Sequence, residues 1–254
     1  THIIIDESHD LTWPMCAFLD RCPQPVITLG DACQRLDGNL SKRSPATRSR
    51  EVVHSIRAGR QIEGVVNTLI DQNPVVRVAH MEGSRERDTK VIYYDNAEIP
   101  TEPATILCNS EWGLFEWFQR LGNAGAKFSL LPGADKAFRL FVLDCIELFN
   151  KSVRPSHSAL FKYTSWASLV KDMAKDDLAF IRIERMLKKG YKATDFEASL
   201  LWLDATGRAP IKLGRVADAR NAEVDTVMLA PDLLSRIESG DRMGAAKALA
   251  AIYT

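Results

Sequence analysis

Two acidic residues, Asp6 and Glu7, close the first hydrophobic run of the chain, Ile3 to Ile5. Paired carboxylates at the end of a buried strand are costly unless a cation or a hydrogen-bond network satisfies them. In phosphoryl transfer, one such acid holds the water shell of Mg²⁺ and the other orients and deprotonates the attacking water. Asp6 is therefore a candidate magnesium residue, through water, and Glu7 a candidate general base. The plainer alternative is a strand that runs into an acidic surface turn.

A second polar group follows the next hydrophobic run. Val26 to Leu29 is followed by Gly30 and Asp31, and Gln34 comes three residues later. Neighbouring strands of a parallel sheet deliver their carboxyl ends to one crevice. We therefore expect the two strands to lie side by side, with the Gln34 amide close enough to sense a γ-phosphate.

These residues must be positioned by an α/β fold, because strands and helices alternate along most of the chain. We expect strands at 3–5, 26–29, 90–94, 104–108, 126–130, 211–213 and 224–229. We expect helices at 11–21, 51–71, 111–121, 136–150, 158–174, 178–189, 194–203 and 241–252. The β-branched run at 3–5 predicts a strand buried on both faces. The unbroken series of helices between 134 and 203 predicts a helical insertion.

In their order along the chain, these motifs resemble superfamily 1 DNA helicases of the UvrD/Rep-like branch, and within it the F-box DNA helicase-like group. Asp6-Glu7-Ser8-His9-Asp10 is similar to motif II, and Gly30, Asp31 and Gln34 match motif III. Ser55-Ile56-Arg57 resembles motif IV, a Ser-x-Arg at the head of a helix. The resemblance implies RecA-like P-loop NTPase sheets, ATP and Mg²⁺ as cofactors, and an Arg57 that reaches the γ-phosphate.

A later stretch resembles motif V of the same family, matched at Gly214, Val216, Ala219, Glu223, Asp225 and Val227. The resemblance implies that Glu223 binds the ATP ribose and that the loop before it touches DNA. It gives DNA-contacting positions to Arg220, Asn109 and Arg35. The motif V histidine, lysine and glycine are replaced by Ala217, Arg220 and Asn221, and Asn109 stands where the family has arginine.

The resemblance also divides the chain into segments. Residues 1–48 are expected to be the C-terminal part of a first RecA-like domain and 49–132 the first part of a second. Residues 133–206 would be a helical insertion similar to the family's 2B domain, and 207–254 the second part of the second domain. The phosphate-cradling loop occurs nowhere in the sequence, and motif VI would begin after Thr254. We therefore expect an excised fragment that hydrolyses no ATP by itself.

Composition sets further limits. With 33 basic and 33 acidic residues, the chain carries no net charge to attract nucleic acid, so phosphate contacts need a local basic group such as the one between Lys42 and Arg60. Neither the five cysteines nor the histidines show metal-ligand spacing, which favours reduced thiols in a cytoplasmic protein. No stretch has the apolar length of a membrane span, so a membrane partner is not expected.

The expected function is therefore part of an ATP-dependent helicase or translocase that moves along single-stranded DNA, 3′ to 5′ as the resemblance implies. Its partner would be single-stranded DNA or a junction of single- and double-stranded DNA. One alternative is a degenerate module that hydrolyses nothing and serves as a DNA-binding or protein-docking platform. Another is a metal-dependent nuclease that uses Asp6, Glu7, Asp10 and Asp31.

Overall fold

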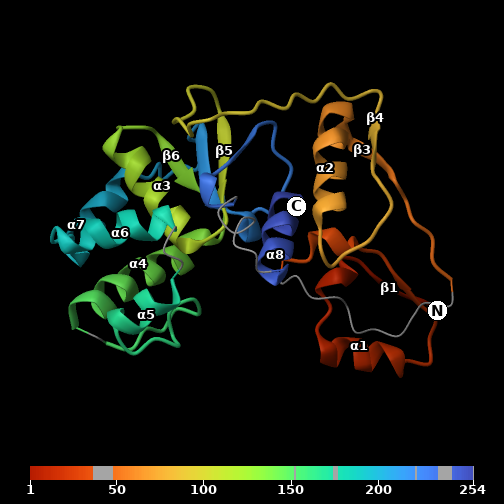
Figure 1. Ribbon diagram of the computed structural model, residues 1–254, viewed down its shortest axis with the longest axis horizontal. Helices are drawn as coiled ribbons and strands as arrows, with labels where there is room; N and C mark the ends of the chain where they lie inside the picture. Colours follow the sequence, from red (N-terminus) through yellow and green to blue (C-terminus); the bar gives the residue numbers. More distant parts are fainter. Residues whose placement is uncertain (37–47, 152, 174–176, 221, 234–241, 254) are drawn as a thin grey trace. The chain divides into compact units, whose positions relative to one another are not determined.

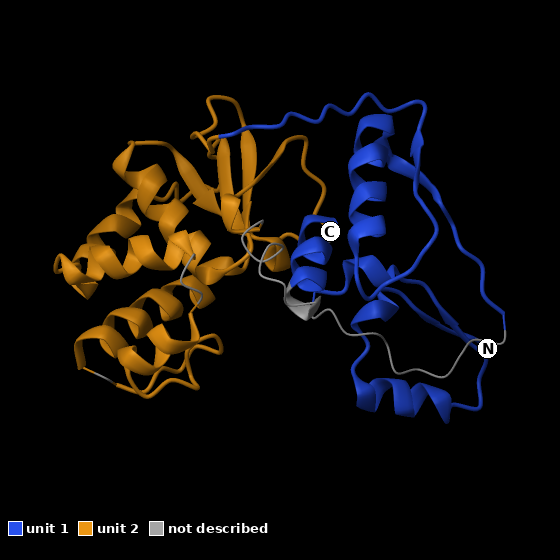
Figure 2. Ribbon diagram, in the orientation of Figure 1, with its two compact units in different colours: residues 1–95, 236–254 blue, residues 96–235 orange. Residues whose placement is uncertain are grey.

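The computed structural model of the chain describes residues 1–36, 48–151, 153–173, 177–220, 222–233 and 242–253. The chain forms two compact units (Figure 2). Unit 1 comprises residues 1–95 and 236–254, and unit 2 comprises residues 96–235. This division places 49–95 with 1–48, whereas the sequence grouped 49–95 with 96–132. Lys42 and Arg43, from the predicted basic group, lie outside the described residues.

The first sheet of unit 1 pairs β1 (Ile3–Ile5) with β2 (Val26–Thr28) in parallel, with Ile4 opposite Ile27. Helix α1 (Trp13–Asp20) buries Cys16 and Leu19 against one face of this sheet. The other face is open, and Ile4 is 65% exposed. The predicted burial of β1 on both faces is therefore wrong, because α1 covers one face of the sheet only.

The rest of unit 1 is built on β3 (His54–Gly59), β4 (Glu82–Ser84), α2 (Arg60–Gln72) and α8 (Arg242–Tyr253). The predicted helix over 51–71 is wrong in its first part, since 54–59 form a strand parallel to β4. The β-branched Val52, Val53 and Ile56 favour an extended chain. Gly59 then marks the change to helix. A Cβ there would lie 2.4 Å from the carbonyl oxygen of Arg87.

A small apolar cluster holds these elements together. Val66 and Ile70 of α2 pack with Cys33, which follows β2, and Tyr253 of α8 packs against the same cluster. The predicted strand at 90–94 is wrong, because these residues form no ladder. The Val91 N–H donates instead to the Gln61 side chain, at 2.9 Å.

Unit 2 contains a parallel sheet in the order β6-β7-β5-β8. Its strands are β5 (Ala104–Cys108), β6 (Phe128–Leu130), β7 (Ile211–Arg215) and β8 (Val227–Leu229). Every residue of β5 is buried, as expected for a strand in the middle of a parallel sheet. Mixed α/β structure with parallel strands is thus confirmed (Figure 1).

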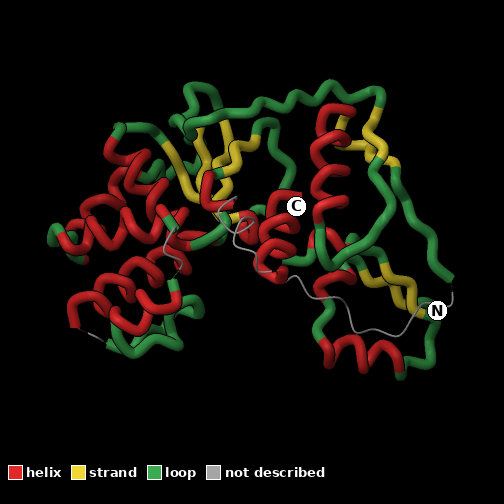
Figure 3. The backbone as a smooth tube through the Cα atoms, in the orientation of Figure 1, coloured by secondary structure: helices red, strands yellow, loops and turns green. Residues whose placement is uncertain are grey.

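Helices gather on one side of this sheet (Figure 3). They are α3 (Glu111–Asn123), α4 (Ala134–Lys151), α5 (Trp166–Asp172), α6 (Leu178–Lys188) and α7 (Ala193–Ser199). The predicted run of helices is therefore present within 134–203. Phe115 and Phe118 of α3 are fully buried among rings from the other helices. Across the described ranges, no helix has the length and apolar character needed to cross a membrane.

Candidate functional site

The ends of β1 and β2 meet, as their sequences predicted. Leu29 N–H donates to the Ile5 carbonyl and Ser8 N–H donates to the Leu29 carbonyl, both at 2.8 Å. Gly30 allows this approach, since a Cβ there would lie 2.6 Å from Ser8 Oγ and 3.0 Å from Ser8 N. The turn after β1 and the turn after β2 therefore form one edge.

The acid pair lies at this edge. The Asp6 side chain is exposed, and its Oδ1 accepts the Glu7 N–H at 2.9 Å. Glu7 is half-buried and has a left-handed backbone, with φ 50° and ψ 39°. A left-handed backbone costs a side-chain-bearing residue about 1 kcal/mol. In the described residues, Glu7 is the one residue other than glycine with a positive φ.

His9 bridges the two strand ends. It is buried, and its Nδ1 accepts the backbone N–H of Asp31 at 3.1 Å. Its Nε2 lies 3.1 Å from Glu7 Oε2. Because Nδ1 accepts a hydrogen bond, the ring proton is assigned to Nε2, which then donates to Glu7. The sequence reasoning assigned no role to His9 beyond its place in the motif II stretch, although its position two residues after the second acid was a usable signal.

The Asp31 carboxylate extends this network. Its Oδ1 accepts the Cys33 N–H at 2.9 Å and caps the 3-10 turn η2 (Ala32–Gln34). Its Oδ2 accepts the hydroxyl of Tyr253 on α8 at 2.6 Å. Burial, with a smaller effect of Asp31, raises the pKa of the Cys33 thiol to about 12. Gln34 and Arg35 are half-buried at the end of this turn, so the predicted Gln34 does lie next to the strand end that meets the acid pair.

Arg57 lies elsewhere in unit 1. It is on β3, which pairs with β4 and not with β1 or β2. Its side chain is exposed, and its backbone N–H donates to Ser55 Oγ at 3.2 Å. The expected place of Arg57 at the head of a helix is thus wrong, although α2 begins three residues later.

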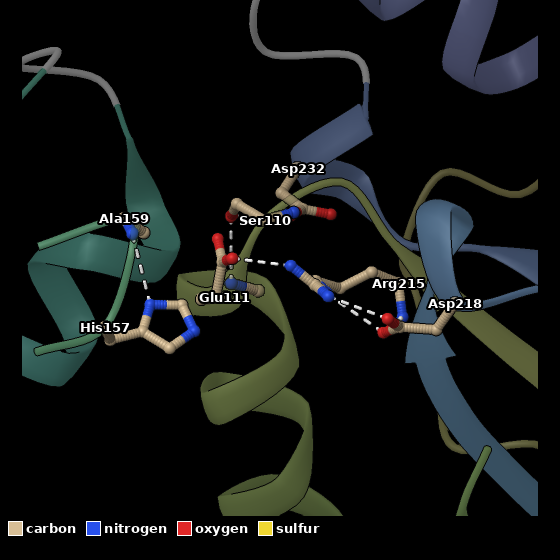
Figure 4. A network of polar contacts seen from close by, with 8 residues as sticks. Ser110, Glu111, His157, Ala159, Arg215, Asp218 and Asp232 are labelled. Carbon is tan, nitrogen blue, oxygen red and sulfur yellow. Dashed lines mark hydrogen bonds and ion pairs between the residues drawn. The ribbon is translucent and has the colours of Figure 1, made fainter. Parts of the chain in front are cut away.

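Asn109, Arg220 and Glu223, the other predicted site residues, belong to unit 2. Asn109 follows β5 and contributes its backbone N–H to Asp232, which follows β8, at 3.0 Å. Ser110 donates its N–H and its hydroxyl to the same carboxylate (Figure 4). Burial raises the pKa of Asp232 to about 6, while these donors act in the opposite direction.

A network of ion pairs around Arg215 lies at the end of β7 (Figure 4). Arg215 pairs with Glu111 at 2.5 Å and with Asp218 at 2.7 Å. The hydrogen bonds that Arg215 donates to Asp218 raise the pKa of Arg215, and the burial of Arg215 acts against them. The sequence reasoning missed Arg215, although it directly follows Gly214, the glycine matched to motif V.

The motif V loop follows this network. Arg220 is half-buried and Glu223 is exposed. Asn221 lies outside the described residues. The structure thus brings Asn109 and Arg215 to neighbouring strand ends of one sheet, with Arg220 a few residues further on.

Comparison with protein-family models and with curated proteins finds no match for this chain. The family resemblance therefore rests on the motifs. Within the described ranges, no group of three or more His, Cys, Asp or Glu side chains could hold a metal ion. Asp6 fits a water-mediated contact to a hydrated cation and would supply only part of its coordination.

Proposed function

We propose that this chain is part of an ATP-dependent superfamily 1 DNA helicase or translocase with RecA-like motor domains. One observation carries the proposal: an exposed Asp6 and a half-buried Glu7 close a parallel strand whose neighbour ends in Gly30-Asp31, and His9 connects the two ends. This arrangement fits acids that act on a phosphoryl group at the carboxyl edge of a parallel sheet.

Each residue has a defined part in the proposal. Bound ATP with Mg²⁺ supplies the reactive phosphoryl group. Glu7 accepts the proton of the attacking water, and His9 keeps its carboxylate in position by donating from Nε2. Asp6 hydrogen-bonds a water of the hydrated cation. Arg57 stabilises the charge that develops on the γ-phosphate, as a bidentate guanidinium can.

The resemblance assigns the remaining roles residue by residue. Glu223 binds the ATP ribose, single-stranded DNA is contacted by Asn109, Arg220 and Arg35, and translocation runs 3′ to 5′. Residues 1–254 contain no glycine-rich phosphate loop with Lys and Ser or Thr, so the chain by itself is expected to hydrolyse no ATP.

The test uses the protein expressed from its complete reading frame. DNA-stimulated ATP hydrolysis is expected, and Glu7→Gln should lower kcat at least about 100-fold while nucleotide binding is kept. Asp20→Asn, on the exposed end of α1, is the matched control and should leave turnover unchanged. A Glu7→Gln protein that hydrolyses ATP as fast as the parent would rule the proposal out.

A second candidate function has its own support. Arg215 is neutralised by Glu111 and Asp218, and the Asp232 carboxylate takes the backbone donors of Asn109 and Ser110. The chain's own carboxylates thus occupy two groups that a DNA phosphate could use, which favours the protein-docking form of the non-hydrolysing alternative over DNA binding in unit 2. A protein-docking platform would show neither ATP turnover nor strand binding through unit 2 in the complete protein.

A further inference from the structure

Exposed aromatic side chains follow a group of basic side chains in residues 85–94, near the end of the first stretch of unit 1. Ile92, Tyr93 and Tyr94 are exposed on an extended segment that forms no ladder, and Tyr93 is 84% exposed. Arg85, Arg87 and Lys90 precede them and are exposed as well. At this exposure, a flat, apolar partner can pack against the ring of Tyr93.

This segment is fixed against the body of unit 1. Arg87 Nε donates to the Ile56 carbonyl at 3.3 Å, and Thr89 Oγ1 accepts the Gly59 N–H at 3.0 Å. The Val91 N–H donates to Gln61 Oε1 at 2.9 Å. These bonds hold residues 87–91 at the end of β3 and the first turn of α2, and Ile92, Tyr93 and Tyr94 follow directly after them. Figure 1 shows this segment passing from β4 over the start of α2.

The same hydrogen bonds bring basic residues of β3, α2 and this segment close together. Arg57 lies two residues before Gly59, and Arg60 follows it directly. A Cβ added at Gly59 would lie 2.4 Å from the Arg87 carbonyl oxygen. The exposed basic residues at this place are Arg57, Arg60, Arg85, Arg87 and Lys90. The exposed acids over residues 82–95 are Glu82, Glu86, Asp88 and Asp95. The five cations therefore outnumber these four acids by one, although the whole chain is neutral.

We propose that this surface, formed by Arg60, Arg87, Lys90, Tyr93 and Tyr94, binds single-stranded nucleic acid. The Tyr93 ring stacks on bases of a single strand, which unstack more easily than the bases of a duplex. The arginines and the lysine pair with the backbone phosphates. None of these residues belongs to the motifs that resemble the helicase family. Only the choice of DNA over RNA rests on the function proposed above.

The test measures fluorescence anisotropy of labelled oligonucleotides with the full 254-residue chain. The probes are oligo-dT of about 15 nucleotides, oligo-rU of the same length and a duplex. Single strands should bind more tightly than the duplex. Tyr93→Ala should weaken oligo-dT binding about tenfold, and Tyr93→Phe should retain it. Tighter oligo-rU than oligo-dT binding would assign the surface to RNA and keep its strand-binding role.

Phe161→Ala is the matched control, because Phe161 is an exposed aromatic beside a lysine in unit 2. It should leave affinity unchanged. Arg87→Gln and Lys90→Gln should each reduce the slope of log Kd against log salt by about 0.7, as expected for one lost phosphate contact on a single strand. Circular dichroism checks that each variant is folded.

The possible failures are distinguishable. Oligo-dT binding that is unchanged in Tyr93→Ala overturns this surface, whether or not the complete protein hydrolyses ATP. Absence of single-strand binding by the folded chain overturns it too. Binding that depends on Tyr93, in a complete protein without ATP turnover, supports the surface and removes the motor function.

Discussion

Gly30 is the residue on which the meeting of the two strand ends depends most directly. Gly30→Ala would place a Cβ 2.6 Å from Ser8 Oγ and 3.1 Å from His9 N. The Ser8 hydroxyl can rotate, but the backbone nitrogens cannot move without opening the turn. We expect a loss of about 1–3 kcal/mol in the free energy of unfolding of unit 1, measured by urea denaturation.

Gly64→Ala is the control for Gly30→Ala. Gly64 lies within α2, is exposed, and has no neighbour within 4 Å of an added Cβ. Alanine should therefore stabilise the helix by about 0.5–1 kcal/mol. Equal effects of the two substitutions would show that Gly30 is not a point of close approach.

Asp232 gives a pH-dependent prediction at the same scale. Its pKa is about 6 in the folded protein and 3.8 for an ordinary carboxyl group. The folded state therefore holds the Asp232 proton more tightly than the unfolded state does. The contribution of this proton to the free energy of unfolding is complete below pH 3.8 and is lost as pH rises to about 6. The gap corresponds to about 3 kcal/mol. Urea denaturation at several pH values should show parent and Asp232→Asn diverging between those limits, with the parent relatively weaker at pH 7.

Asp204 should give a pH dependence of stability opposite in sign to that of Asp232. Hydrogen bonds from Thr206, partly opposed by desolvation, lower the pKa of this exposed carboxyl group. Its stabilisation is therefore present at neutral pH and lost as pH falls through the lowered pKa. Asp204→Asn should reduce stability at neutral pH and not in strong acid.

A difference between parent and Asp232→Asn that stays constant from pH 4 to 7 would contradict the account of Asp232.

At the scale of elements, a side-chain hydrogen bond and an apolar cluster hold α8 to the turn η2. Tyr253→Phe keeps the ring and removes the 2.6 Å bond to Asp31. We expect a loss of about 1–3 kcal/mol, because the carboxylate acceptor is charged. Hydrogen exchange should become faster in both α8 and η2. Tyr93→Phe, on an exposed tyrosine of the same unit, should change neither.

The elements also show where sequence patterns succeed. Ala104 to Cys108 form β5 as predicted, since a short apolar run between turn residues is typical of a strand buried in a parallel sheet. The failure at 51–59 has a physical cause. Val52, Val53 and Ile56 fit helical spacing when counted, yet Val52 and Ile56 are exposed, so apolar type did not mean burial.

Contacts between distant residues could not be predicted. Asp31 and Tyr253 are 222 positions apart, and Glu111 and Arg215 are 104 apart. The sequence placed Asp6, Glu7 and Asp31 at neighbouring strand ends because parallel strands share an edge. It contained no rule that would bring the last helix to Asp31, since that contact depends on how α2, α8 and η2 pack together.

At the scale of the whole molecule, the two compact units should unfold separately. Phe118 is fully buried in unit 2, with its ring centroid 5.6 Å from that of Phe128. Phe118→Ala should destabilise unit 2 by about 3–5 kcal/mol and leave unit 1 unchanged. Tryptophan fluorescence reports mainly on unit 2, which holds Trp112, Trp117, Trp166 and Trp202.

Amide exchange by mass spectrometry follows both units in the same sample. In Phe118→Ala, exchange should become faster in the segments of unit 2 and keep its rate in α2. Faster exchange of equal size in both units would show that they unfold as one cooperative body.

The left-handed backbone of Glu7 has a consequence for how this protein changes over generations. Glycine or asparagine would relieve the backbone cost of about 1 kcal/mol at this position, and it would remove the carboxylate that accepts the His9 Nε2–H. Selection on the backbone conformation alone would favour that exchange. Glutamate kept at this position among descendants would therefore record continuing use of the acid, and its replacement by glycine or asparagine would mark lineages that have abandoned it.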